Sequence, residues 1–143
     1  LSDNVGWLDY THTITFADAV WSSCRRYPDT WPAALLQLAC FSGRNASFTH
    51  RELNGAQWQV EDAEQFFTTE VEGLFDHARE EYIVSVHLLK TILSARKLVN
   101  SGAAGDSVSS LLGAMNRFLH EPLKRKHVRR TMRQALAFVA RDG

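Results

Sequence analysis

Residues 82–93 read YIVSVHLLKTIL and are apolar almost all the way round a helix. Such a helix usually lies at the centre of a bundle, because every side of it needs apolar neighbours. At about 100° per residue, one predicted apolar face holds Phe75, Ala78, Tyr82, Val86, Leu89 and Leu93. A narrow polar stripe holds Glu80, His87, Lys90, Thr91 and Ser94. This stripe is either a solvated edge or a buried one whose charges need partners.

Apolar side chains at three- and four-residue spacing recur along the rest of the chain, and no segment alternates like a strand. We therefore expect an all-α fold, a single-domain bundle of five or six helices with a long central helix, over residues 1–143. Asp9 is the expected N-cap of the first helix, Gly43 the left-handed stop of the second, and Thr68-Thr69 a break in the longest. The expected helices cover residues 10–27, 33–41, 61–99, 106–119 and 122–140, and residues 46–58 form a loop with room for one short helix.

Composition argues against a membrane-spanning helix. The 143 residues are 45% hydrophobic, carry 16 basic and 16 acidic side chains, and contain no apolar run of membrane-spanning length. Cys24 and Cys40 lack metal-type spacing, so we expect two buried, reduced thiols and a cytoplasmic protein. The chain opens on Leu1, which is compatible with a fragment of a larger protein.

Histidines beside carboxylates are the candidates for acid–base or metal chemistry. His77 and Glu80 are three residues apart, and His87 follows Glu80 by two helical turns, about 10 Å along the axis. These three residues are the candidate metal ligands, and a metal ion is the one cofactor that the sequence suggests. The chain has no Glu-x-x-His motif, which carboxylate-bridged metal centres in helical bundles use. The most similar motif in the chain is Asp9-x-x-His12. His12 also has a structural interpretation, in which Asp9 caps the helix and His12 lies in its first turn.

Charge is divided unevenly between the two ends of the chain. Residues 122–143 carry a net charge of +6 and residues 1–121 carry −6. The last helix is expected to be amphipathic as well as basic, so it can dock and present its charges outward. It either packs on the acidic residues 61–81 or binds a protein partner. No recognition motif supports nucleic-acid binding.

Two short stretches, HTITFADAV at residues 12–20 and SVHLLKTILSA at residues 85–95, resemble the helical C-terminal part of questin oxidase-like proteins. That family is associated with Baeyer–Villiger-type oxidation of polyketide anthraquinones. The resemblance implies that His12, His87 and Lys90 line a shared pocket as the catalytic residues, with His as base and Lys as electrostatic partner. The chain has neither a dinucleotide-binding fingerprint nor a Rieske ligand pair, so a missing upstream domain is one implied partner.

Three functions follow from these observations. The first is a helical domain of an oxidoreductase that acts on a small aromatic polyketide-type substrate in a His/Lys-lined pocket. The second is a non-catalytic helical adaptor that binds a protein through its basic C-terminal helix. The third is a metal-binding helical bundle. The first predicts that His12 and His87 lie within one cleft, about 10 Å apart or less, since one small substrate must touch both.

Overall fold

A computed structural model of the chain describes residues 7–46, 55–75, 82–120, 136–137 and 139–141. Every regular element in these ranges is helical, which confirms the all-α prediction. None of the described helices combines the length and apolar character needed to cross a membrane. The long helices are α1 (Trp7–Arg26), α2 (Trp31–Arg44), α3 (Ala63–Phe75), α4 (Tyr82–Asn100) and α5 (Val108–His120), and short 3-10 turns lie at Pro28–Thr30, Ala56–Trp58 and Gly105–Ser107.

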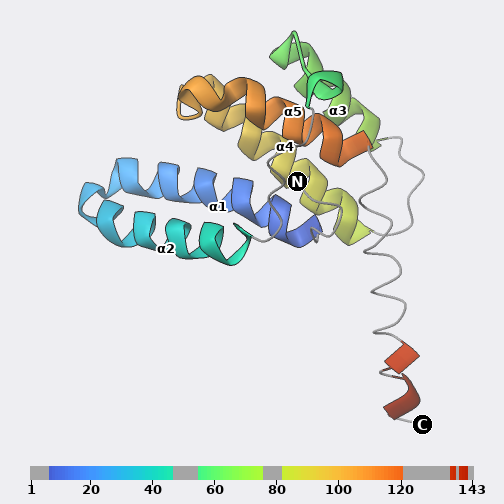
Figure 1. Ribbon diagram of the computed structural model, residues 1–143, viewed down its shortest axis with the longest axis horizontal. Helices are drawn as coiled ribbons and strands as arrows, with labels where there is room; N and C mark the ends of the chain where they lie inside the picture. Colours follow the sequence, from blue (N-terminus) through green and yellow to red (C-terminus); the bar gives the residue numbers. More distant parts are fainter. Residues whose placement is uncertain (1–6, 47–54, 76–81, 121–135, 138, 142–143) are drawn as a thin grey trace.

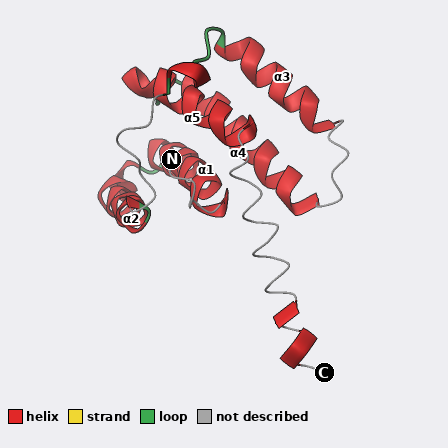
Figure 2. Cartoon of the chain, turned by 45° about the vertical axis from the view of Figure 1, so that its right-hand side comes forward, coloured by secondary structure: helices red, strands yellow, loops and turns green. Residues whose placement is uncertain are grey.

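Helix α4 lies at the centre of the bundle, as expected, with α1 on one side and α3 and α5 on the other (Figure 1). Helices α1 and α4 run parallel, because His12 meets His87, and Asp18 meets Lys97 further along both helices. Helices α3 and α4 run antiparallel, since Glu64 at the start of α3 pairs with Arg96 near the end of α4. Helix α2 packs against α1 at the edge of the bundle (Figure 2).

The apolar core lies where α1, α3, α4 and α5 meet. Phe67 of α3 and Ile92 of α4 have no exposed surface, and the rings of Tyr10 and Phe118 lie 4.4 Å apart. Apolar burial of this kind holds the four helices together. The buried cluster comprises Tyr10, Ile14, Phe67, Leu88, Ile92, Ala95, Leu98, Leu112, Met115 and Phe118.

The structure corrects the expected helix ends. Helix α1 begins at Trp7, so Asp9 lies in its first turn and is not the N-cap. Helix α2 continues through Gly43 to Arg44, and the described glycines with positive φ are Gly102, just after α4, with φ of 75°, and Gly105, with φ of 47°. The break expected near Thr68 and Thr69 is wrong, because α3 runs through both residues. Residues 136, 137 and 139–141 are helical, and the rest of the expected last helix lies outside the described residues.

The predicted apolar face of α4 is also wrong. Val86 and Leu93 are 61% and 47% exposed, whereas Thr91 and Ser94 of the polar stripe are buried. The hydroxyl of Thr91 donates to the carbonyl of His87 at 2.7 Å, so its burial costs little. Lys90 and Lys97 lie on the same side as Val86 and Leu93, and their charges keep that side in water.

Tyr10 provides a test of the core. Its hydroxyl is buried and has no hydrogen-bond partner among the described residues, and burial raises its pKa far above the ordinary value. We expect Tyr10→Phe to leave the free energy of unfolding unchanged or to raise it by about 1 kcal/mol, because the ring stays and an unpaired polar group goes. Urea denaturation measures this change, with exposed Tyr27→Phe as the control. A loss above about 1 kcal/mol would show that the hydroxyl is bonded after all.

Candidate functional site

Polar side chains, most of them hydroxyl-bearing, line the contact between α1 and α4. On α1, Thr11, Thr15, Asp18 and Ser22 recur at one helical stripe, and on α4 His87, Thr91 and Ser94 do the same; we call these seven residues the polar seam. Its hydroxyls donate to carbonyls of their own helix, as Thr15 does to Thr11 at 3.0 Å and Ser22 to Asp18 at 2.7 Å. Short side chains satisfied in this way let two helices approach closely without unpaired polar groups.

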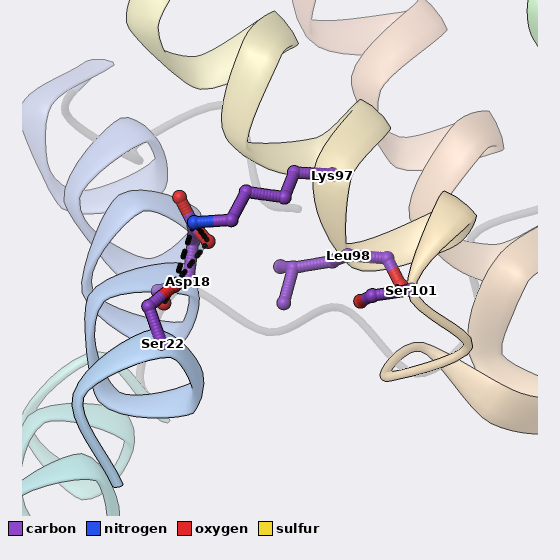
Figure 3. Close-up of polar contacts among 5 residues, drawn as sticks. All are labelled: Asp18, Ser22, Lys97, Leu98 and Ser101. Atoms are coloured by element: carbon purple, nitrogen blue, oxygen red, sulfur yellow. Dashed lines mark hydrogen bonds and ion pairs between the residues drawn. The ribbon is translucent and has the colours of Figure 1, made fainter. Parts of the chain in front are cut away.

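A lysine joins α4 to α1 at the C-terminal end of the polar seam. Lys97 extends from α4 to α1, where its Nζ lies 2.9 Å from Asp18 Oδ1 and donates to the Ser22 hydroxyl at 2.6 Å (Figure 3). Leu98 points toward α1 beside it (Figure 3). Because the Lys97 side chain is 54% exposed, the ion pair adds less than about 1 kcal/mol of stability.

Toward the N-terminal ends of α1 and α4, the structure brings together the two histidines that the sequence singled out. The rings of His12 on α1 and His87 on α4 have centroids 5.7 Å apart and planes tilted by 55°. Both side chains are half-buried. The separation is within the expected limit of about 10 Å.

Charged side chains from three helices surround the pair. Lys90 lies one turn after His87 on α4 and is exposed. Asp9 lies one turn before His12 on α1, and its carboxylate accepts a hydrogen bond of 3.2 Å from Arg44 at the end of α2. We call these five residues, Asp9, His12, Arg44, His87 and Lys90, the histidine site.

The surroundings of His12 lower its pKa. Burial is the largest cause, because it disfavours the imidazolium; the neighbouring His87, Lys90 and Arg44 act in the same direction, and Asp9 opposes them. His12 is therefore neutral at pH 7 and can accept a proton. A neutral imidazole next to a lysine ammonium is an arrangement suited to removing a proton and stabilising the resulting anion.

This lowered pKa makes stability depend on pH. Between the folded and the unfolded pKa of His12, the unfolded chain binds more protons, so the free energy of unfolding rises with pH. We expect the contribution of neutral His12 to the free energy of unfolding to be fully present above the ordinary pKa of about 6.5, and to fall as the pH drops below that value. Urea denaturation at several pH values measures this fall, which His12→Gln should reduce. An unchanged pH dependence in that variant would contradict the burial of His12.

The metal site expected at His77, Glu80 and His87 stays a prediction, because His77 and Glu80 lie outside the described residues. Among the residues that the structure does describe, no three His, Cys, Asp or Glu side chains gather closely enough to hold a metal ion. His87, the described member of that set, lies against His12.

Sequence reasoning missed Arg44 as a member of the histidine site. Arg44 and Asp9 are 35 residues apart in the chain, and only the packing of α2 on α1 brings them together. The expectation of two buried thiols holds for Cys24 and is wrong for Cys40, which is exposed on α2; both are free. Helix α2 has an open outer face, and the sequence contains no signal for that.

Comparison of the chain with family models, curated proteins and solved structures found no match. The function is therefore inferred from the geometry of the histidine site.

Proposed function

We propose that the chain is a helical domain of an oxidoreductase that acts on an aromatic polyketide-type substrate, and that the histidine site removes a proton from that substrate. The observation that carries the proposal is the 5.7 Å separation between the rings of His12 and His87, with Lys90 one turn away. The family resemblance names the same three residues. Their proximity in space supports a shared role for them.

Each of the three residues has its own role in this proposal. His12 accepts the proton, because it is held neutral at pH 7. The electron pair of the broken O–H or C–H bond stays on the substrate as a phenolate or enolate, and the Lys90 ammonium stabilises its negative charge. His87 acts as a positioning residue, because its ring packs beside His12 and disfavours the imidazolium.

Polyketide-type aromatic compounds suit such a site for two reasons. Their phenols and enolisable ketones are acidic enough for an imidazole to deprotonate. Their flat rings can also pack against the imidazoles and against Phe16 and Phe41, whose rings lie 5.9 Å apart between α1 and α2. Deprotonation makes such a ring richer in electrons, which prepares it for oxidation.

Ionisation of a bound phenol tests this proposal without any oxidant. Alizarin, a dihydroxyanthraquinone, absorbs at longer wavelength as an anion than as a neutral molecule. We expect the chain to lower the pH at which alizarin ionises by about one unit, a tenfold shift in the equilibrium. His12→Gln and Lys90→Gln should each remove most of that shift. His120→Gln and Lys97→Gln are the matched controls, because they change the same residue types outside the histidine site and should keep the shift.

Two results would contradict the proposal. One is alizarin that binds with no change in its ionisation, and the other is a shift that survives both site variants. We also infer a cytoplasmic setting, since Cys40 is an exposed free thiol and such thiols persist in reducing compartments.

The adaptor function has one observation in its favour. Leu136 and Val139 are 67% and 69% exposed. In this alternative the basic C-terminal helix docks on a protein partner through these side chains. Binding to an acidic helical peptide, followed by fluorescence anisotropy, would weaken in Leu136→Glu and stay unchanged in His12→Gln. The reverse pattern would favour the enzyme.

A further inference from the structure

The separation of the two rings in the histidine site matches that of two ligands on one metal ion. A zinc–nitrogen bond is about 2.0–2.1 Å long and the nitrogen lies about 1.1 Å from the ring centroid, so each centroid would lie about 3.2 Å from the ion. Two such rings have centroids about 5.2 Å apart at the tetrahedral angle and about 6.4 Å apart on opposite sides of the ion. The observed separation between His12 and His87, 5.7 Å, lies between these limits.

The orientation and exposure of the rings also suit two ligands. Rings stacked face to face could not share an ion, whereas the planes of His12 and His87 are tilted by 55°. Tilted rings can direct one nitrogen each to a common point. Both side chains are half-buried, so an ion can reach them from solvent without opening the bundle.

The two imidazoles are carried by backbone that the core holds in place. Thr11, which precedes His12 on α1, has no exposed surface, and Leu88, which follows His87 on α4, is 1% exposed. The histidines therefore come from two packed helices and not from a loop. Ligands held in this way lose little freedom when they bind an ion, which favours binding.

We propose that His12 and His87 bind a zinc ion as its two protein ligands, with water in the remaining positions. Imidazole nitrogen is a preferred ligand of zinc, whereas calcium and magnesium prefer oxygen. Asp9 is not a third ligand, because its carboxylate accepts a hydrogen bond of 3.2 Å from Arg44, and the described residues contain no group of three metal ligands. With two protein ligands, we expect the ion to bind more weakly than in a closed structural site.

Zinc and a proton compete for the same lone pair of His12. One nitrogen of a neutral imidazole already carries a proton, so zinc on the other nitrogen leaves no position that can accept one. Bound zinc would therefore stop His12 from acting as a base. This regulatory consequence rests on the proposed function, whereas the binding of zinc rests only on the positions of the two rings.

Titration of the full chain with zinc, followed by NMR of the histidine ring nitrogens, tests the proposal. We expect the signals of His12 and His87 to shift along one common binding curve, with a dissociation constant on the order of 10 μM. His12→Gln and His87→Gln should each raise that constant at least about 10-fold, because each removes one of two protein ligands. His120→Gln is the matched control, since His120 pairs with Glu70 outside the histidine site, and it should leave the constant unchanged.

Urea denaturation shows whether the ion joins the two helices of the folded chain. An ion that binds the folded chain and not the unfolded chain stabilises the folded state. We expect ~1 mM zinc to raise the urea midpoint of the unaltered chain and of His120→Gln, but not that of His12→Gln or His87→Gln. Circular dichroism without zinc checks that all variants are folded.

Three results would overturn the proposal. The first is the absence of a shift in either ring at ~1 mM zinc. The second is a shift in His12 or His87 alone, and the third is a shift of His87 together with His77 while His12 stays unchanged. A chain that binds zinc through both rings and leaves the ionisation of alizarin unaltered in metal-free buffer would support the zinc site and contradict the proposed function.

Discussion

Replacing His12 with glutamine should slow proton abstraction from an enolisable aromatic ketone by about 10²–10⁴-fold, the usual contribution of a general base. Deuterium exchange at the acidic carbon of β-tetralone in heavy water measures this rate and needs no oxidant. The carbon-bound proton passes to the imidazole of His12, the enolate oxygen carries the charge, and a deuteron from solvent returns to the carbon. Glutamine keeps much of the size and polarity of histidine but cannot act as a base at neutral pH.

Other variants separate the roles within the histidine site. Lys90→Met should slow the exchange less than His12→Gln, because it removes stabilisation of the enolate and leaves the base in place. His87→Gln should move the pH at which the rate rises, since it alters the pKa of His12 and not the base itself. His120→Gln, which changes an exposed histidine that pairs with Glu70 at 2.7 Å, is the control and should exchange at the unaltered rate. Equal losses in His12→Gln and His120→Gln would contradict the account.

The largest loss of stability is expected from Phe67→Ala, at about 3–5 kcal/mol. Phe67 has no exposed surface and lies in the core, where α3 meets α4 and α5. Its removal leaves a cavity that the surrounding helices can fill only in part. The loss is a large fraction of the 5–15 kcal/mol by which a domain is usually stable, so the variant should be partly unfolded at low urea concentrations.

Helix α3 itself offers the matched control. Phe75 is 82% exposed on the same helix, and Phe75→Ala should change the free energy of unfolding by less than about 0.5 kcal/mol. Urea denaturation followed by circular dichroism measures both variants. A loss below about 1 kcal/mol for Phe67→Ala, or similar losses for the two, would show that the core has been placed on the wrong face of α3.

Much of the fold could be predicted from local patterns, because apolar side chains spaced three and four residues apart indicate a helix. The apolar stretch at residues 82–93 predicted the central position of α4 correctly. The side that α4 turns to water could not be predicted from hydropathy. Thr91 is polar by composition, but its hydroxyl bonds within the helix and is buried, while Val86 shares its side with Lys90 and is exposed.

The histidine site was predictable only in part, for a related reason. The proposed family resemblance predicts that His12 and His87 lie together, and the structure places their rings 5.7 Å apart. Arg44 could not be found, since its contact with Asp9 depends on how α2 packs on α1. Contacts between residues far apart in the chain are set by tertiary packing, which helical periodicity does not specify.

The claim that His12, His87 and Lys90 act as one site can be tested directly by NMR titration of the histidine rings. We expect His12 to titrate below the ordinary value of 6.5, and its pKa to rise part of the way back in His87→Gln and in Lys90→Gln. Burial is the largest cause of the depression and stays in both variants, so the return should be incomplete. A His12 ring that titrates at its ordinary value in the unaltered chain, and does not move in either variant, would contradict the account.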